Sequence, residues 1–186
     1  MVSLTALVIP IVLSAVIVFI ASSILHMVLP YHHSDLKKVP REDEVQAALR
    51  PFNIPPGDYA LPCGSGPSDM KNAAFLDKLN KGPVAFMTVV APGPRPMGTA
   101  LVLWLIYSIV ISLFAGYIAS RALGPGAPYL SVFRFVGASA FMGYSLGMVH
   151  MSIWYSRSWT TTLKDVVDGL IYGLLTAGTF GWLWPH

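Results

Sequence analysis

The amino-acid sequence predicts an all-α integral membrane protein with four transmembrane helices and a small mixed α/β extramembrane domain between the first two. Three observations lead to this fold class. Charged residues make up only 11% of the 186 residues, about half of the share in a typical soluble domain. The apolar residues, 54% of the chain, are concentrated in four long stretches. A polar, proline-rich stretch separates the first of these from the other three.

Residues 4–29 form the first predicted span. They contain no Asp, Glu, Lys or Arg, and the segment exceeds the roughly 20 residues that a helix needs to cross a bilayer. No basic residue precedes it, and it is longer than the apolar region of a secretory signal, so a membrane helix is favoured over a cleaved signal. Pro10 predicts a bend in its first half or a shorter span that begins after it.

Three further spans are predicted at residues 99–120, 130–155 and 165–184. Each segment is apolar around its whole circumference, which a helix in water does not tolerate. Each is expected to cross as a helix, because backbone polar groups in lipid must be satisfied within the segment. The linkers at residues 121–129 and 156–164 are short, and glycine and proline in the first of them stop one helix and delay the next.

The insert at residues 30–98 is expected to fold as a small extramembrane domain. A proline followed by three acidic residues predicts a helix over 41–50. A second helix is predicted over 68–80, with Ser68 or Asp69 as its N-terminal cap.

Two strands are predicted in the same insert, over residues 58–62 and 84–90, where β-branched and aromatic residues are frequent. A domain of this size has little core of its own. We therefore expect it to rest on the membrane surface or on another protein.

The charges that flank the spans predict a cytoplasmic insert and termini on the outer side. Basic residues near the membrane are more frequent on the side of the insert, and positive charge marks the cytoplasmic side. On the side of the insert they are Lys37, Lys38, Arg41, Arg95, Arg157 and Lys164, and on the other side Arg121 and Arg134.

Small residues recur every four positions in the last three predicted spans, which places them on one stripe of each helix. Such stripes let helices approach closely where lipid offers no hydrophobic driving force between them. We expect these three spans to pack tightly, with the first span attached more loosely. The stripes are Ser108, Ser112, Gly116 and Ser120; Ser139, Gly143 and Gly147; and Gly169, Gly173, Ala177 and Gly181.

A group of histidines is predicted to share one membrane face. His26 ends the first span and His150 lies near the corresponding end of the third, while His32, His33 and Asp35 follow the first span directly. Imidazoles and carboxylates suit zinc, iron or copper, and a b-type haem held between His26 and His150 is a variant of this hypothesis. The alternative is that these are amphipathic interfacial side chains that reach the headgroups.

The charges near the fourth span favour structural roles. Thr161 or Thr162 is expected to cap the helix, with Asp165 and Asp168 in its first turn near the positive end of the dipole. Lys164 is expected to pair with Asp168. Arg134, near the opposite face, is expected to reach the interface or a lipid phosphate.

The sequence favours a non-catalytic membrane subunit, or an accessory or assembly protein, that packs against other membrane proteins or against a second copy. An enzyme is not favoured, because no phosphate-binding loop or nucleophile elbow is present. The net charge of +3 reflects membrane orientation, so nucleic acid is not an expected partner. The alternatives are a metal- or haem-binding membrane protein and a small oligomeric transporter, whose polar cavity would be lined by Ser108, Ser112, Thr176 and Thr179.

Three segments, YHHSD after the first span, PPGDYALP in the insert and DGLIYGLLTAGTFGWLWP at the end, resemble small bacterial inner-membrane proteins. The resemblance implies a location in the bacterial inner membrane. It implies no activity and no site residues.

Overall fold

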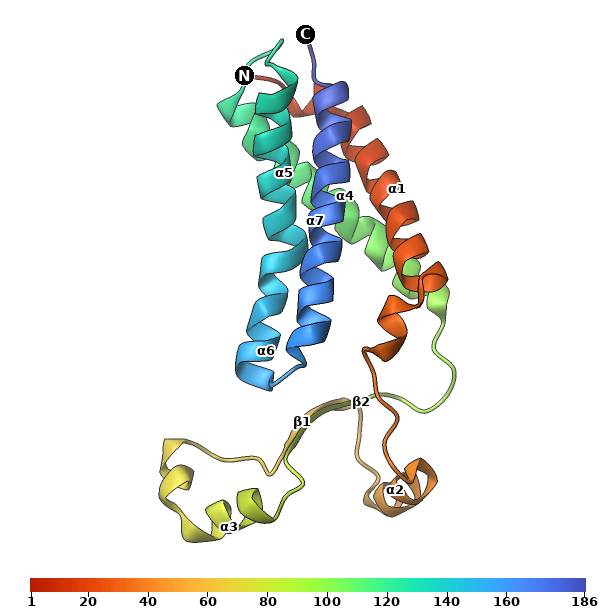
Figure 1. Ribbon diagram of the computed structural model, residues 1–186, viewed down its shortest axis with the longest axis vertical. Helices are drawn as coiled ribbons and strands as arrows, with labels where there is room; N and C mark the ends of the chain where they lie inside the picture. Colours follow the sequence, from red (N-terminus) through yellow and green to blue (C-terminus); the bar gives the residue numbers. More distant parts are fainter. The chain divides into compact units, whose positions relative to one another are not determined.

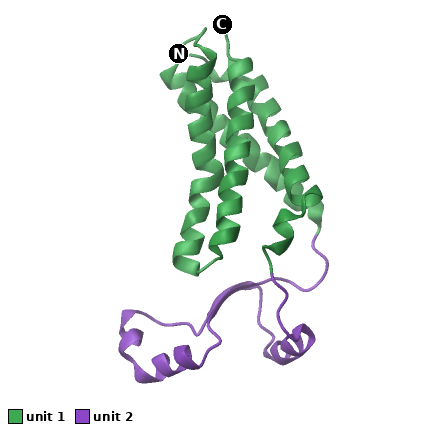
Figure 2. Ribbon diagram, viewed as in Figure 1, with its two compact units in different colours: residues 1–36, 96–186 green, residues 37–95 purple.

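The computed structural model describes all 186 residues. The chain folds into two compact units, the first made of residues 1–36 and 96–186 and the second of residues 37–95 (Figure 2). Unit 1 is a helical bundle. Unit 2 lies within the predicted insert, and residues 30–36 and 96–98 of that insert belong to the bundle instead. Each unit is described separately below.

The helices of unit 1 are long and mostly apolar. Three stretches are long and apolar enough to cross a membrane, namely Leu4–Val28, Met97–Ala122 and Tyr129–Tyr155, and these correspond to the first three predicted spans. In order, the elements are a 3-10 helix Leu4–Leu7, α1 Val8–Ser23, a π-helix Ile24–Val28, a 3-10 helix Pro30–Ser34, α4 Met97–Ala122, α5 Tyr129–Ser145, a 3-10 helix Leu146–Met148, α6 Val149–Tyr155 and α7 Trp159–Trp182.

The fourth predicted span lies within α7, which has 24 residues and begins at Trp159. The first half of α7 carries Lys164, Asp165 and Asp168. For this reason α7 is less apolar than the other three long helices, although 24 residues at 1.5 Å each are sufficient to cross hydrocarbon about 30 Å thick.

The bundle is held together by close contacts among all four long helices. The α5–α7 pair makes the most extensive contact, and α1 packs against both α4 and α7 (Figure 1). In α1, Ser14 is fully buried and donates a hydrogen bond to Ser112 of α4 at 3.0 Å. The prediction that the first span is only loosely attached is therefore wrong, because its own small side chains let it fit against two neighbours.

The small-residue stripes of α4 and α7 face the interior. Ser108, Ser112 and Gly116 are buried in α4, and a Cβ at Gly116 would lie 2.9 Å from the ring of Phe180. In α7 the stripe lies along α5, where the absence of a side chain permits close backbone approach. The buried residues of this second stripe are Gly169, Gly173 and Ala177.

Only part of the third-span stripe packs against another helix. A Cβ at Gly143 would lie 2.6 Å from Cδ1 of Ile111 in α4, so the two helices are in close contact there, whereas nothing lies within 4 Å of a Cβ built at Gly147, which belongs to the 3-10 helix after α5. Ser139 is only partly covered, and its hydroxyl bonds to the carbonyl of Phe135 within the same helix. The row of side chains that α5 buries is one position further along the chain, at Val132, Val136, Ala140 and Tyr144.

Unit 2 contains the predicted helices and strands. α2 spans Glu42–Leu49, α3 spans Ala73–Lys81, and short 3-10 helices span Arg50–Phe52 and Pro67–Lys71. The strands β1 (Gly57–Leu61) and β2 (Ala85–Val89) pair antiparallel, with Gly57 opposite Val89 and Leu61 opposite Ala85. The small two-stranded sheet that the sequence predicts is thus present.

The predicted cap of α3 is wrong. Ser68 and Asp69 belong to the preceding 3-10 helix, and the side chain of Asn72 accepts the hydrogen bond from the backbone N–H of Ala74 at 2.9 Å. No residue of unit 2 is buried. A two-stranded sheet is marginally stable by itself in water, so unit 2 lacks the apolar core that an independent domain needs.

Candidate metal centre

The candidate site forms where the end of the first long helix turns back onto α7. After α1 the chain continues as the π-helix Ile24–Val28, which carries His26. Leu29 is extended, and Pro30 then opens a 3-10 helix over Pro30–Ser34. Single π-turns are rare in proteins, but those that occur are often at functional sites. Here the irregular turn brings two successive histidine-bearing segments against the same part of α7.

Three side chains meet at one point. The Nε2 atom of His32 lies 2.8 Å from Oδ2 of Asp168, and the Nε2 atom of His26 lies 3.5 Å from the same oxygen. The two imidazole rings are 4.1 Å apart between centroids. Asp168 and His32 expose 3% and 8% of their side chains, whereas His26 exposes 45%. The site is thus buried on the side of α7 and open at His26.

A second layer of groups orients these three side chains. Oδ2 of Asp35 lies 2.5 Å from Nδ1 of His32, and Nζ of Lys164 donates to Oδ1 of Asp35 at 2.7 Å. Lys164 also donates to the backbone carbonyl of Tyr31, whose hydroxyl donates to Oδ1 of Asp168. These contacts fasten residues 30–35 to α7.

The second layer also favours the ionised form of Asp35. Burial of Asp35 opposes its ionisation, but hydrogen bonds from Lys164 and His32 outweigh this and hold the pKa of the Asp35 carboxyl below its usual range. Asp35 is therefore an acceptor at neutral pH, and it accepts the Nδ1–H of His32. A ring nitrogen held in this way fixes the tautomer of the histidine and leaves Nε2 as the ligand atom.

The spacing of the donor atoms suits a metal ion. The ligand atoms of His26, His32 and Asp168 all lie within 4.8 Å of one another. Ligands at 2.0–2.2 Å from a tetrahedral Zn²⁺ are about 3.4 Å apart, so small side-chain movements would close the site. Three protein ligands leave one position open to water or another molecule, as in catalytic rather than structural zinc sites.

An aromatic wall supports the site on the inner side. The hydroxyl of Tyr172 lies 3.3 Å from Nε2 of His26. Its ring contacts those of Trp104 and Tyr144, with centroids 5.9 Å and 5.5 Å away, and the indole N–H of Trp104 donates to Ser22 of α1 at 2.7 Å. Edge-to-face packing is a favourable arrangement of aromatic rings, and it positions the Tyr172 hydroxyl as a hydrogen-bond partner of His26.

The structure brings together some of the predicted ligands and not others. His26, His32 and Asp35 lie together, with Asp35 in the second layer. His33, although adjacent to His32, is exposed. His150 is exposed in α6, and its Nδ1 bonds to the carbonyl of Gly147. No contact joins it to His26, so the structure does not form the His26–His150 pair that the haem hypothesis requires.

Asp168 is the member of this cluster to which the sequence analysis gave a structural role and which it did not include among the candidate ligands. α7 begins at Trp159 and no side chain caps it, so the expected caps Thr161 and Thr162 are wrong, because both lie inside the helix. Asp168 is about two and a half turns from the start, too far to interact with the helix dipole. The available signal was an acidic residue within an apolar helix, which marks a functional site by default.

The expected ion pair between Lys164 and Asp168 is also absent. Lys164 pairs with Asp35 instead of Asp168, because the segment after α1 reaches its ammonium group. Asp165 pairs with Arg157 at 2.5 Å. Asp168 therefore has no cationic side chain other than histidine beside it.

The hydroxyls that the transporter hypothesis places in a polar cavity instead make hydrogen bonds inside the bundle. Ser108 donates to the carbonyl of Trp104, and Ser112 accepts from Ser14. Thr176 and Thr179 each donate to the carbonyl four residues earlier in α7. All four side chains are buried.

No protein-family model, curated protein or solved structure matches this chain. The decisive features are a buried carboxylate, two imidazole nitrogens directed at it, and a second carboxylate that orients one imidazole.

Proposed function

We propose that the chain is an integral membrane protein that binds one divalent transition-metal ion through His26, His32 and Asp168. The observation that carries this proposal is the position of Oδ2 of Asp168, which faces both Nε2 atoms while Asp35 holds the far side of the His32 ring. A carboxylate–histidine–metal arrangement with this second layer is typical of protein metal sites.

The donor set indicates which ions fit. Two imidazoles and one carboxylate suit Zn²⁺, Fe²⁺ or Co²⁺, and an open position allows an exchangeable ligand. The geometry favours a bare ion over a haem, because the rings of His26 and His32 are 4.1 Å apart and leave no room for a porphyrin between them. Zn²⁺ is the natural probe, since it has no redox chemistry.

We further propose that α7 crosses the membrane as the fourth span, in the bacterial inner membrane and with residues 30–98 on the cytoplasmic side. Support comes from the contact of α7 with both α5 and α1 and from the partners of its charged residues. Lys164 and Asp165 are paired, and Asp168 is buried toward the bundle. Charged side chains in membrane helices face the bundle interior in this way.

Zinc binding by the purified full-length protein tests the proposal. Titration calorimetry and metal analysis in mild detergent should give one Zn²⁺ per chain for the wild type. H32A and D168N should each weaken binding by at least about tenfold, the lower end of the effect of second-layer substitutions. H33A is the matched control, because His33 is adjacent but exposed. Equal binding by all four proteins would contradict the proposal.

Unit 2 supports a second role, as an accessory subunit that packs against another membrane protein or a second copy of the chain. No residue of unit 2 is buried, and Phe52, Met70 and Val84 expose 72%, 62% and 56% of their surface. A unit of this size with no core of its own gains stability by packing against another surface, and these apolar side chains are available for that contact. Purification from native membranes in mild detergent should bring a stoichiometric partner, whereas a chain that runs alone as a monomer would contradict this role.

A further inference from the structure

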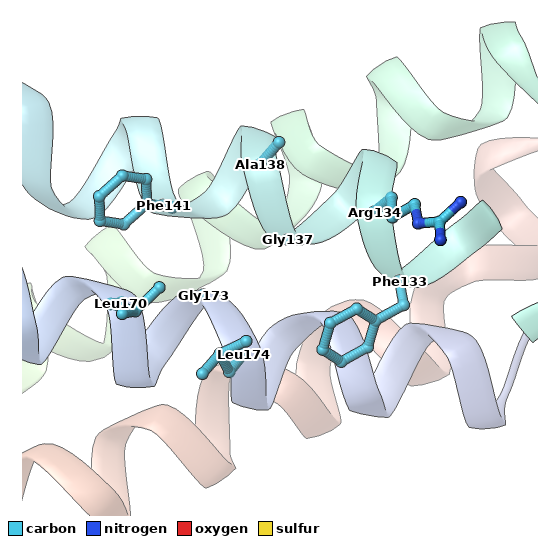
Figure 3. A pocket seen from close by; sticks show the side chains of 8 residues that line it. All are labelled: Phe133, Arg134, Gly137, Ala138, Phe141, Leu170, Gly173 and Leu174. Carbon is cyan, nitrogen blue, oxygen red and sulfur yellow. The ribbon is translucent and has the colours of Figure 1, made fainter. Parts of the chain in front are cut away.

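A groove on the surface of the bundle runs along the line where α5 and α7 meet. It has a volume of about 220 Å³. Gly137 and Gly173 form its floor, and Figure 3 shows Phe133 and Arg134 at one end and Phe141 at the other. The groove is separate from the candidate metal centre, because none of the ligands lines it.

The two floor glycines explain why the groove exists. A Cβ at Gly137 would lie 3.1 Å from the Cβ of Ala177, and one at Gly173 would lie 3.2 Å from the backbone nitrogen of Phe141. The backbones of α5 and α7 are thus in close contact here, as small residues allow in membrane helices. Larger side chains on each side, such as Phe133 and Leu174, stand above this floor and enclose an apolar channel.

Arg134 makes one end of this channel positively charged, whereas the rest of the lining is uncharged. It is the only charged residue of the lining, it is exposed, and no hydrogen bond or ion pair engages its guanidinium group. It lies within the first two turns of α5, which begins at Tyr129. An arginine near the end of a membrane helix extends its charge to the headgroup level, where phosphate is the anion that its planar fork binds best.

We propose that this groove is a binding site for an anionic phospholipid, with the phosphate on Arg134 and one acyl chain along Gly137 and Gly173. A cation at one end of an apolar channel matches the two ends of this molecule in charge and polarity. A partner helix would cover the channel but would leave the guanidinium unpaired in an apolar contact, which is costly. The charge complementarity therefore favours a lipid over a protein.

Native mass spectrometry of the full-length protein tests this with two lipids of equal chain length, dioleoyl phosphatidylglycerol and dioleoyl phosphatidylcholine. The wild type should retain phosphatidylglycerol in preference. R134Q should reduce that preference about fivefold, the effect of one basic residue near a membrane surface. R121Q is the matched control, because Arg121 is a membrane-flanking arginine outside the groove that is already bonded to the carbonyl of Val2. An R134Q protein with the wild-type preference would overturn the proposal.

Two further measurements separate the headgroup from the acyl chain. A138F places a ring in the groove from an exposed position and should reduce retention of both lipids, with a circular-dichroism melt to show that the variant is folded. Glycerol 3-phosphate, which carries the phosphate without acyl chains, should not displace the bound lipid. Displacement by glycerol 3-phosphate at equal concentration, or unchanged lipid retention in folded A138F, would show that the acyl chain does not occupy the groove and would overturn the proposal.

Discussion

The ion pairs of the two units differ in how far their side chains are exposed to solvent. In unit 1, His32, Asp35 and Lys164 form pairs whose side chains are 8–18% exposed. In unit 2, Lys38–Glu42, Arg41–Glu44 and Lys81–Asp77 are pairs within single helices or turns, with side chains 45–78% exposed. Exposed pairs contribute little to stability, whereas breaking a buried pair leaves a desolvated charge. The ion pairs whose loss would destabilise the fold are therefore those of unit 1, where residues 30–35 contact α7.

The largest expected effect follows from removing the buried carboxylate. D168A leaves His26, His32 and the hydroxyl of Tyr31 without their common partner. We expect a loss of about 3–5 kcal/mol in the free energy of unfolding, typical of a broken buried pair, measured by denaturant titration in detergent. D77A, in unit 2, is the control and should cost less than about 1 kcal/mol. Equal losses would remove the distinction between the two units.

The next effect concerns the second layer of the site. D35N retains the shape of the side chain but weakens its hold on Nδ1 of His32 and its pair with Lys164. Zinc affinity should fall about 10- to 100-fold, as is usual when a group that orients a histidine ligand is altered. Calorimetric titration provides the measurement, with E44Q in unit 2 as the control. If D35N binds zinc as tightly as the wild type, Asp35 has no orienting role.

A smaller effect is expected at the contact between α5 and α7. G173A adds a Cβ 3.2 Å from the backbone of Phe141, and overpacking of this kind costs about 1–3 kcal/mol. G147A adds a Cβ that meets nothing within 4 Å and should change the free energy of unfolding by no more than about 0.5 kcal/mol. Thermal unfolding followed by tryptophan fluorescence compares the two variants. Equal melting temperatures would argue against close packing at Gly173.

The smallest effect is predicted for an exposed pair. K81A removes the partner of Asp77 at 2.6 Å, but both side chains are more than half exposed. Because solvent screens such a pair, zinc affinity and the melting temperature should both remain at the wild-type values. A clear fall in zinc affinity in K81A would show that unit 2 influences the metal site.

Local sequence signals predicted the elements of unit 2 and three of the long apolar helices. Proline and glycine mark the ends of α2 and β2, so these elements can be read from neighbouring residues. The rotation of α5 could not be predicted in the same way. Which face of a helix is buried depends on the partner that fills the space. Here α5 buries Val136 and Ala140 and approaches α7 at Gly137 and Phe141.

Only part of the candidate site could be predicted from the sequence, for a related reason. His26, His32 and Asp35 follow one another closely in the sequence, so their membership of one group could be predicted. Asp168 is more than 130 residues away from His32, and its role depends on where α7 begins. The chain reverses at Ser156, which has a φ of 54°, and this places Asp168 well inside the helix. Tertiary contact, which no local pattern encodes, then directs it toward the two histidines.

X-ray absorption at the zinc edge of the metal-loaded protein tests the central claim most directly. The site predicts two imidazole nitrogens and one carboxylate oxygen at about 2.0–2.2 Å from the ion. The imidazole contribution should disappear in a protein that carries both H26A and H32A, and it should persist in one that carries H33A and H150A. A zinc spectrum without imidazole scattering in the wild type, or one unchanged by H26A and H32A, would contradict the assignment.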